Sequence, residues 1–563
     1  MENKKYMTID GIPVEINGEK NLLEVIRKTG IQMPTFCYYS ELSVYGACRM
    51  CMVENEWGGF DAACSTPPRE GMNIKTNTEK LRKYRKNILE LLLANHCSDC
   101  TTCEKSQNCK LQDLARRFKI DGVRFPNTAS NEPKDASSPC IVKDNSKCIL
   151  CGDCVRVCNE IQNVGAIDFA HRGSKMVIST AFNKPLAESP CVGCGQCVAV
   201  CPTGALVLHS DADKIWEGLA QKDAKKTVQI APAVRVAIGK ELGINDGDDV
   251  MGKIVAALHL IGFDEVYDTT FGADITVMEE TKEFIERLEN GGKIPLITSC
   301  CPAWIQYAEK RHPELLDNIS SCRSPMQMLA SIIKEKARLN NEKHFHVAIM
   351  PCTAKKFEAS RDEFKVDGAP DVDAVLTTKG LIRMIQEAGI VFEELAPEAV
   401  DMPYGTVSGA GVIFGVTGGV TEAVLRRVSE NKTRAELISI ANIGQRGNEG
   451  IKEFEIPYGE ATLKIAVCSG LANAEKLIKR MENGEHFDFI EVMACPGGCV
   501  CGGGQPFAVK ETKLRRSEGL YSTDKLNTLR RSQDNPVMKS LYEDFLNGKE
   551  HQLLHVHYHS KKK

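Results

Sequence analysis

The hydrophobic pattern divides the chain into two parts. From about residue 225 onward, short apolar runs alternate with segments of helical periodicity, which indicates α/β construction with a largely parallel sheet. Four apolar runs each lead into a loop with proline or cysteine, and they are 228–231 before Pro232, 294–298 before Cys300, 346–350 before Cys352 and 489–493 before Cys495. Ligands of open α/β sheets bind beyond the carboxyl ends of the strands. We therefore expect these loops to converge on one site.

The first 140 residues follow a different pattern. Residues 6–16 and 47–55 are typical of short strands around turn glycines, whereas residues 80–96 repeat apolar side chains at helical spacing. Residues 125–139 are rich in proline, serine, asparagine and aspartate, which is typical of a connector. The pattern predicts a small β-rich module followed by a helix and a linker.

Composition narrows the class of protein. The chain has 563 residues and a formal charge of -4, so it is long enough for three or four domains and has no uniform positive field for nucleic acid. No apolar stretch approaches the roughly 18 residues that a membrane span needs. The polar N-terminus has no secretory h-region. We expect a cytoplasmic protein without membrane or nucleic-acid partners.

The 25 cysteines are the unusual feature of the composition. Seventeen lie between Cys37 and Cys201, and eight lie from Cys300 onward. Cytosolic thiols are kept reduced, so spaced cysteines there indicate metal ligands or catalytic groups rather than disulfides.

The first cysteine group predicts a [2Fe-2S] cluster. Its ligands are Cys37, Cys48, Cys51 and Cys64, in which a close Cys-x2-Cys pair is flanked by single cysteines. The alternative is a set of scattered buried thiols. The spacing differs from that of plant-type ferredoxins and resembles the N-terminal module of the large iron-sulfur subunit of respiratory complex I.

A repeated Cys-x2-Cys-x2-Cys-x3-Cys motif is the most specific signal. It is the run of bacterial two-cluster ferredoxins, in which the fourth cysteine binds the other cluster. The predicted [4Fe-4S] ligand sets are Cys148, Cys151, Cys154 and Cys201 for one cluster, and Cys191, Cys194, Cys197 and Cys158 for the other. Asn159 stands where the motif has proline.

A further cluster is predicted between these modules, with two possible ligand sets. Spacing alone permits Cys97, Cys100, Cys103 and Cys109. The segment also resembles the His-x3-Cys-x2-Cys-x5-Cys site of iron hydrogenases and complex I, which replaces Cys97 by His96. We favour His96 on that resemblance.

Three cysteine segments occur after Cys201 that are not ferredoxin loops. They are Thr298-Ser299-Cys300-Cys301-Pro302, Met350-Pro351-Cys352-Thr353-Ala354-Lys355 and Met493-Ala494-Cys495-Pro496-Gly497-Gly498-Cys499. Four of their five thiols could hold another [4Fe-4S] cluster, and one would remain beside it, because the adjacent side chains of Cys300 and Cys301 diverge. The following glycines would let the backbone approach a bulky group, and Lys355 would supply a cation.

These segments resemble the signature motifs of the [FeFe]-hydrogenases, and with the N-terminal modules the resemblance covers nearly the whole chain. It is greatest for the monomeric clostridial type. The resemblance implies an H-cluster, a [4Fe-4S] cube joined to a diiron unit with CO, cyanide and a bridging dithiolate. The implied cube ligands are Cys301, Cys352, Cys495 and Cys499, with Cys499 as the bridge. The implied pocket residues are Lys355, Met350, Met493, Phe414, Ala231 and Pro232, although the apolar ones could equally be ordinary core.

The resemblance also implies a proton path. It runs from Cys300 through Glu280, Ser320 and Glu283, with Arg287 at its outer end. Spacing alone would favour a solvated, salt-bridged helix face for Glu280, Glu283 and Arg287. Cys140, Cys322 and Cys468 are expected to be small buried side chains, and Cys501 has no assigned role.

The expected fold class is an α+β multidomain protein, with β-grasp ferredoxin-like and 2[4Fe-4S] ferredoxin-like domains on an α/β H-cluster domain. The expected domains are 1–79 ([2Fe-2S]), 80–125 (His/Cys-ligated [4Fe-4S]), 126–212 (2[4Fe-4S]), 213–510 (H-cluster) and 511–563 (C-terminal helical segment). The implied activity is that of a ferredoxin hydrogenase, with one [2Fe-2S] cluster, three accessory [4Fe-4S] clusters and an H-cluster.

The implied partners are ferredoxin or flavodoxin and the H-cluster maturation proteins, and the chain is expected to be a monomer. No dinucleotide fingerprint follows a strand, so direct use of NADH is not expected. The alternatives are the catalytic subunit of an NAD-linked bifurcating hydrogenase, and a hydrogen sensor or iron-sulfur assembly relative without catalysis.

Overall fold

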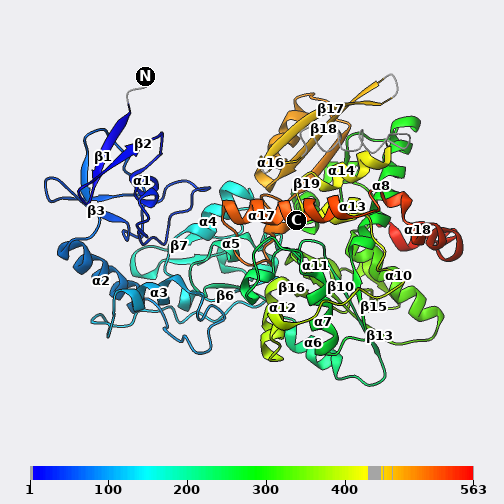
Figure 1. Ribbon diagram of the computed structural model, residues 1–563, viewed down its shortest axis with the longest axis horizontal. Coiled ribbons are helices and arrows are strands. Elements are labelled where there is room, and N and C mark those ends of the chain that lie inside the picture. The colour runs from blue at the N-terminus through cyan, green and yellow to red at the C-terminus, as the bar shows by residue number, and fades with distance from the viewer. Residues whose placement is uncertain (1–3, 429–445, 448, 459–460, 562–563) are drawn as a thin grey trace. The chain divides into compact units, whose positions relative to one another are not determined.

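The computed structural model describes residues 4–428, 446–447, 449–458 and 461–561. The chain forms two compact units (Figure 1). The first contains the described residues up to Glu160 together with Gly165–Ser189 and Val200–Val207. The second contains Ile161–Val164, Pro190–Ala199 and the described residues from Leu208 onward. No helix among the described residues combines the length and the apolar character needed to cross a membrane.

The first unit is built on a five-stranded sheet with the order β2-β1-β5-β3-β4. Its strands are β1 (Lys5–Ile9), β2 (Ile12–Ile16), β3 (Met52–Asn55), β4 (Phe60–Ala62) and β5 (Asn73–Lys75). β1 and β2 form an antiparallel hairpin, and both turn residues, Asp10 and Gly11, have positive φ, which suits aspartate and glycine. The hairpin confirms the short strands predicted around a turn glycine at 6–16, whereas the strand within 47–55 begins only at Met52.

Helices and short strands complete this unit. They are α1 (Leu22–Lys28), α2 (Glu79–Ala94), α3 (Lys110–Arg117), β6 (Ile141–Lys143), α4 (Asp153–Arg156), β7 (Asp168–Ala170), β8 (Val177–Ser179) and β9 (Leu206–Leu208), whose last residue belongs to the second unit. The Asn21 side chain caps α1 by accepting from the Glu24 N–H, and the apolar face of α1 is buried. α2 confirms the helix predicted over 80–96. Residues 125–139 contain no helix or strand.

The second unit contains two four-stranded sheets. The first has the order β11-β10-β13-β16 and is parallel throughout, and the second has the order β12-β19-β18-β17, in which only the β17–β18 pair is antiparallel. The strands are β10 (Lys225–Ile230), β11 (Glu265–Asp268), β13 (His344–Met350), β16 (Ala374–Thr377), β12 (Leu296–Ile297), β17 (Ile451–Tyr458), β18 (Ala461–Ser469) and β19 (Phe489–Met493). The expected parallel construction is correct, but it is distributed over two sheets.

The run at 294–298 yields a strand of only two residues, Leu296 and Ile297. Pro295 precedes it and has no N–H to donate, which limits the ladder on that side. By contrast, β13 is almost entirely buried, as its apolar sequence requires.

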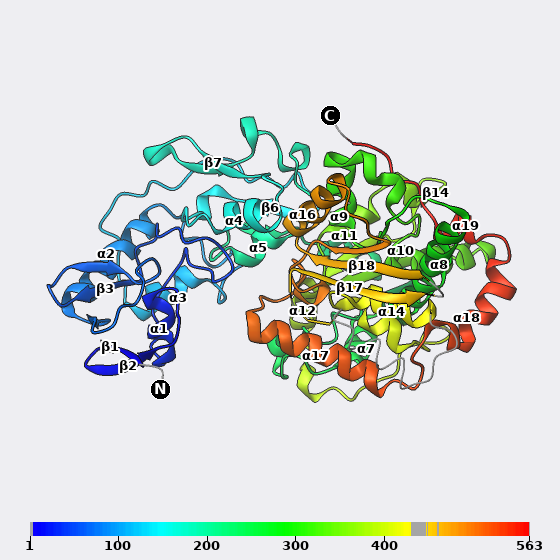
Figure 2. The ribbon, with the colours of Figure 1, turned by 90° about the horizontal axis from the view of Figure 1, so that it is seen from above.

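Helices cover both sheets. They are α5 (Gln196–Val200), α6 (Ala212–Leu219), α7 (Met251–Ile261), α8 (Thr270–Asn290), α9 (Pro302–Arg311), α10 (Pro325–Leu339), α11 (Ala354–Ala359), α12 (Thr378–Glu387), α13 (Gly409–Val412), α14 (Gly419–Val428), α16 (Leu471–Glu482), α17 (Lys510–Leu526), α18 (Pro536–Ser540) and α19 (Glu550–Leu554). Helix α16 packs on β18 and β19, in the orange part of the ribbon in Figures 1 and 2. The last fifty residues are helical in part, as expected.

Candidate functional site

Four thiols meet where strands of both sheets of the second unit end. Cys301 lies between β12 and α9, Cys352 follows β13, and Cys495 and Cys499 follow β19. Burial raises the pKa of Cys495, and the thiols of Cys352, Cys301 and Cys499 raise it further. Burial and the thiols of Cys301 and Cys352 act in the same direction on Cys499. The structure thus brings together the four predicted cube ligands.

Glycines of the third cysteine loop are required by neighbouring backbone. A Cβ on Gly502 would lie 2.2 Å from the Pro351 carbonyl oxygen, and one on Gly503 would lie 2.3 Å from the Cys194 carbonyl oxygen. The Gly504 N–H donates to the Pro351 carbonyl at 2.9 Å. These glycines therefore allow the loops that contain Cys194, Cys352 and Cys499 to pack against one another. The sequence had suggested only that these glycines let the backbone approach an inorganic group.

Cys300, the fifth thiol, points into an apolar cluster next to the other four. It packs with Phe414 and Met493, which are buried, as are Ala231 and Met350 at the ends of β10 and β13. Burial raises the pKa of Cys300 far above its usual range, and the carboxyl of Glu280 raises it further. Cys300 consequently stays a neutral thiol that can carry a proton.

Lys355 is a buried cation in the same site. Its ammonium donates to the Cys300 carbonyl at 3.3 Å and pairs with Glu358 at 2.7 Å. Glu358 also accepts from the Ser324 hydroxyl at 3.1 Å. Glu358 was not predicted, although its position three residues after Lys355 on one helix was the signal that could have found it.

The predicted proton path is partly connected in the structure. Glu280, Glu283 and Arg287 all lie on α8. Glu280 is fully buried, and neither carboxylate oxygen has a hydrogen-bond partner among the described residues. Burial, reinforced by the charge of Glu283, raises the pKa of Glu280 to about 8. A fully buried Glu280 excludes the solvated helix face that spacing alone favoured.

The outer part of the path is joined by hydrogen bonds. The Ser320 hydroxyl donates to Glu283 at 2.9 Å, and Arg287 forms an ion pair with the same carboxylate. Ser321 donates to Glu283 through its N–H and its hydroxyl, at 3.0 Å and 3.1 Å. His555 lies 2.8 Å from the Ser321 hydroxyl. Ser321 and His555 were not predicted, because nothing local in the sequence connects the C-terminal tail with α8.

The predicted [2Fe-2S] ligands lie together in the first unit. The Cys48 N–H donates to the Cys37 sulfur at 3.3 Å, and a hydrogen bond from the Cys37 thiol lowers the pKa of Cys48 to about 6. Cys51 is paired in the same way with Cys64, and its pKa is lowered. Buried Arg85 donates to the carbonyls of Met50 and Met52, on either side of Cys51. The α2 helix thereby fixes the ligand loop.

At the next predicted site, Cys97 and Cys103 both lie near Cys100. Burial raises the pKa of Cys100, and the nearby thiols of Cys103 and Cys97 add to the effect. Cys109 is similarly influenced by Cys103 and Cys100. His96 is buried, and its Nδ1 accepts from the Ser98 N–H at 2.9 Å, which fixes the ring.

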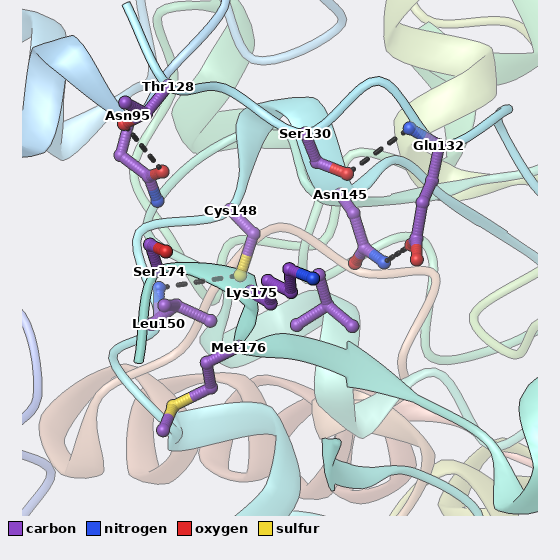
Figure 3. A pocket seen from close by; sticks show the side chains of 11 residues that line it. Asn95, Thr128, Ser130, Glu132, Asn145, Cys148, Leu150, Ser174, Lys175 and Met176 are labelled. Carbon is purple, nitrogen blue, oxygen red and sulfur yellow. Dashed lines mark hydrogen bonds between the residues drawn. The ribbon is translucent and has the colours of Figure 1, made fainter. Parts of the chain in front are cut away.

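One ferredoxin-like ligand set lies within the first unit. The pKa of Cys151 is raised by burial and by the nearby thiols of Cys201 and Cys148. A cavity of about 190 Å³ lies beside Cys148, whose sulfur accepts from the Leu150 N–H at 3.4 Å (Figure 3). The cluster loop therefore borders open space at this point.

Of the other predicted ligand set, Cys191, Cys194 and Cys197 belong to the second unit and Cys158 belongs to the first. The Cys158 sulfur accepts from the Ala166 N–H, and the Cys191 sulfur from the Gly193 N–H, both at 3.4 Å. Cys194 is near enough to Cys495 to raise its pKa. This predicted cluster loop thus adjoins the four-thiol site.

Family models match five successive segments of the chain. They are a 2Fe-2S iron-sulfur cluster binding domain (residues 6–79), the NADH-ubiquinone oxidoreductase-G iron-sulfur binding region (85–124), a 4Fe-4S dicluster domain (147–205), the iron only hydrogenase large subunit, C-terminal domain (224–503), and the iron hydrogenase small subunit (510–561). The order of iron-sulfur modules followed by a hydrogenase segment is the one that the cysteine motifs predict.

Whole-chain relatives extend this match. The chain is 41% identical to the NADP-reducing hydrogenase subunit HndD of Solidesulfovibrio fructosivorans over 98% of each chain. It is 37% identical to iron hydrogenase 1 of Clostridium pasteurianum over 98% of this chain and 100% of the relative. Among solved structures, [FeFe]-hydrogenase HydA1 from Chlamydomonas reinhardtii is 37% identical with a TM-score of 0.54, covering 63% of this chain and 100% of that one.

Proposed function

Because the chain belongs to the [FeFe]-hydrogenase family, we propose that it catalyses the reversible reduction of protons to H2 with electrons delivered through its iron-sulfur clusters. The observation that carries this proposal is the convergence of four thiols, two buried and two partly buried, beside Cys300, Lys355 and Glu280. Iron-sulfur clusters are held by cysteine thiolates, and proton reduction needs a donor next to the metal site. The four thiols and the proposed proton donor lie together at the carboxyl ends of β12, β13 and β19.

The donor set fits the H-cluster. Cys301, Cys352, Cys495 and Cys499 lie together, and the Ala494 N–H donates to the Cys301 sulfur at 3.4 Å. Thiols that raise one another's pKa hold their protons when no metal is present. They become thiolates when a metal ion replaces those protons, and the metal then stabilises the negative charge. These four would hold the cube, and Lys355 would face the anionic diatomic ligands. When bound, the H-cluster supplies the redox centre at which electrons meet protons.

The protein's own residues would move the protons. Cys300 holds a proton at its sulfur, and Glu280 is protonated at neutral pH because its pKa is about 8. The Glu280 carboxyl lies near Cys300 on one side and Ser320 on the other, and it can exchange a proton with each. Ser320 donates to Glu283 at 2.9 Å. Arg287 stays charged and positions Glu283 rather than carrying the proton.

Electrons would enter through the N-terminal clusters. We propose the [2Fe-2S] cluster, the His96 cluster and the two ferredoxin-like [4Fe-4S] clusters as the chain of carriers, within domains 1–79, 80–125 and 126–212. The proximity of Cys194 to Cys495 supports transfer from the ferredoxin-like pair into the catalytic domain 213–510. Residues 511–563 form the C-terminal segment. Reduced ferredoxin or flavodoxin is the proposed donor in the cytoplasm.

A second candidate concerns the electron partner. The relative that is 41% identical over nearly the whole chain is a subunit of an NADP-reducing hydrogenase. The chain could accordingly serve as the catalytic subunit of a complex in which another subunit handles the nicotinamide. This alternative leaves the chemistry at the four-thiol site unchanged.

One series of assays tests these proposals. The protein is produced with the H-cluster maturation proteins, and infrared spectroscopy is expected to show CO and cyanide bands. H2 evolution is then measured with reduced viologen, with reduced ferredoxin and with NADPH. Activity with ferredoxin and none with NADPH supports the monomeric enzyme, whereas NADPH-linked activity only after addition of partner subunits supports the complex. Absence of both infrared bands and viologen activity would refute the hydrogenase proposal.

A further inference from the structure

A carboxylate, a thiol and an imidazole meet at the outer part of the proposed proton path. Ligand atoms of Glu283, Cys322 and His555 all lie within 4.8 Å of one another. We propose that these three residues form a binding site for Zn²⁺, and that metal bound there inhibits the enzyme by removing Glu283 from proton transfer. The binding claim stands on the geometry alone, whereas the inhibition claim rests on the proposed function.

The site is built by backbone pairing between distant segments. Cys322 and His555 face each other across an antiparallel bridge. The Arg323 N–H donates to the Leu554 carbonyl at 2.8 Å, and the Val556 N–H donates to the Ser321 carbonyl at 2.7 Å. The Arg323 guanidinium also donates to the His555 carbonyl at 3.0 Å. Two of the three ligands are therefore held in register before any metal arrives.

Helix α8 supplies the third ligand, Glu283. Its Oε1 faces Arg287, whereas its Oε2 accepts from Ser320 and Ser321 and lies 3.9 Å from the Cys322 sulfur. Oε2 is the atom that faces the thiol. A metal on Oε2 would replace the Ser320 hydrogen bond, which is the link that the proton path needs.

The imidazole of His555 is oriented as in protein zinc sites. One nitrogen, Nε2, lies 3.1 Å from a carboxylate oxygen of Glu279, and Nδ1 faces Ser321 at 2.8 Å. A histidine that ligates a metal commonly directs its other ring nitrogen to a carboxylate, which fixes the ring and strengthens the ligand. Glu279 is itself buried and accepts from Tyr542. Glu279 is thus the carboxylate that orients the His555 ring.

The donor set selects the metal. Cysteine sulfur, histidine nitrogen and carboxylate oxygen are the ligands of Zn²⁺, whereas Mg²⁺ and Ca²⁺ prefer oxygen alone. Three protein ligands leave a fourth tetrahedral position for water. On binding, the Cys322 sulfur exchanges its proton for the metal, and that proton passes to solvent. Glu279 adds negative charge nearby, while Arg287 is the opposing cation on Glu283.

The test uses the fully maturated enzyme with added ZnCl2. Bound metal is measured by equilibrium dialysis, its ligands by zinc K-edge X-ray absorption, and activity by H2 evolution from reduced viologen. We expect one zinc with a single sulfur neighbour and nitrogen or oxygen neighbours, and at least tenfold inhibition that EDTA reverses. Cys322→Ala and His555→Ala are expected to weaken zinc binding by at least the roughly 10- to 100-fold that follows loss of an outer-shell partner.

Matched controls are His559→Ala, which removes an exposed histidine of the same tail, and Cys468→Ala, which removes a buried thiol elsewhere in the second unit. Both are expected to bind zinc as the unchanged protein does. A zinc spectrum without sulfur, or unchanged affinity in both Cys322→Ala and His555→Ala, overturns the site. Zinc bound with one sulfur but without loss of activity overturns the inhibition. A protein without any hydrogenase activity would refute the proposed function, and the absorption spectrum would still decide the metal site.

Discussion

The [2Fe-2S] ligand set and the four-thiol set of the second unit are assembled in opposite ways. Cys37, Cys48, Cys51 and Cys64 come from one short stretch, where backbone N–H groups and Arg85 hold a single loop. The four thiols between Cys301 and Cys499 come from loops after strands of two different sheets. The first set depends on local sequence, and the second exists only once both sheets have formed.

The pKa values of the thiols also differ between the two sets. In the first set the thiols pair, so that one member has a lowered pKa and the other a raised one. In the second set burial raises the pKa of every thiol. A thiolate is therefore available locally in the first site before metal binding, whereas the second must gain its thiolates together with the metal.

Loss of a ligand should expose this contrast most strongly. Cys499→Ser is expected to lower H2 evolution from reduced viologen by about 10³-fold or more, equivalent to about 4 kcal/mol of activation free energy. Cys64→Ser is expected to lower it only a few-fold, because viologen can deliver electrons to another cluster. Infrared spectra are the second measurement, since only Cys499→Ser should alter the CO and cyanide bands. Equal losses of activity in the two variants would contradict the comparison.

Substitution of Cys300 should distinguish proton delivery from cluster binding in the second unit. Cys300→Ser is expected to lower turnover by about 10²- to 10⁴-fold, the range for loss of a general acid, because a serine hydroxyl gives up its proton far less readily. The infrared bands should persist. Cys501→Ser, at a neighbouring buried thiol without an assigned role, is the control. Full turnover in Cys300→Ser would rule out the relay.

Glu280 should impose a pH dependence on the second site alone. The pKa of Glu280 is about 8, so this carboxyl loses its proton above pH 8. The proposed relay then has no proton to pass on at this position, and activity should fall about tenfold per pH unit above pH 8. The unfolded chain releases this proton near the ordinary value of 4.5, so folded stability should fall as pH rises from 4.5 to 8.

Glu280→Gln should abolish both pH effects, and Glu280→Asp should retain a step in activity. Rate profiles and thermal midpoints between pH 6 and pH 9 provide the measurement. A profile of the unchanged enzyme that is flat across pH 8 would contradict the pKa shift.

The smallest expected effects concern the His96 site. His96→Ala is expected to lose one cluster signal in EPR and to lower the iron content from about 20 to about 16 atoms per chain, with a few-fold loss of ferredoxin-linked activity. Cys97→Ser should change neither quantity. The reverse result would assign Cys97 as the ligand.

The sequence predicted local features better than those created by tertiary packing. Cys-x2-Cys spacing was sufficient to propose ligands, and the runs before Cys352 and Cys495 were sufficient to predict the parallel strands, because both signals lie within a few residues. The grouping of Cys301 with Cys499 required the resemblance to a family. Burial of Glu280 could not be predicted, since its helical spacing is the same on a solvated face. Ser321 and His555 were missed because more than two hundred residues separate them.

Helix α8 carries Glu279 and Glu280 on one turn, Glu283 on the next and Arg287 on the one after, and it therefore fixes the spacing of these side chains. At 1.5 Å and about 100° per residue, the helix sets how far below the surface Glu280 lies and which way each carboxylate faces. A single residue inserted between Glu280 and Glu283 would turn the outer half of the path away from Ser320 while leaving every ligand thiol in place. Insertions and deletions between Glu280 and Arg287 should therefore disrupt the proposed path whichever residues are inserted or removed.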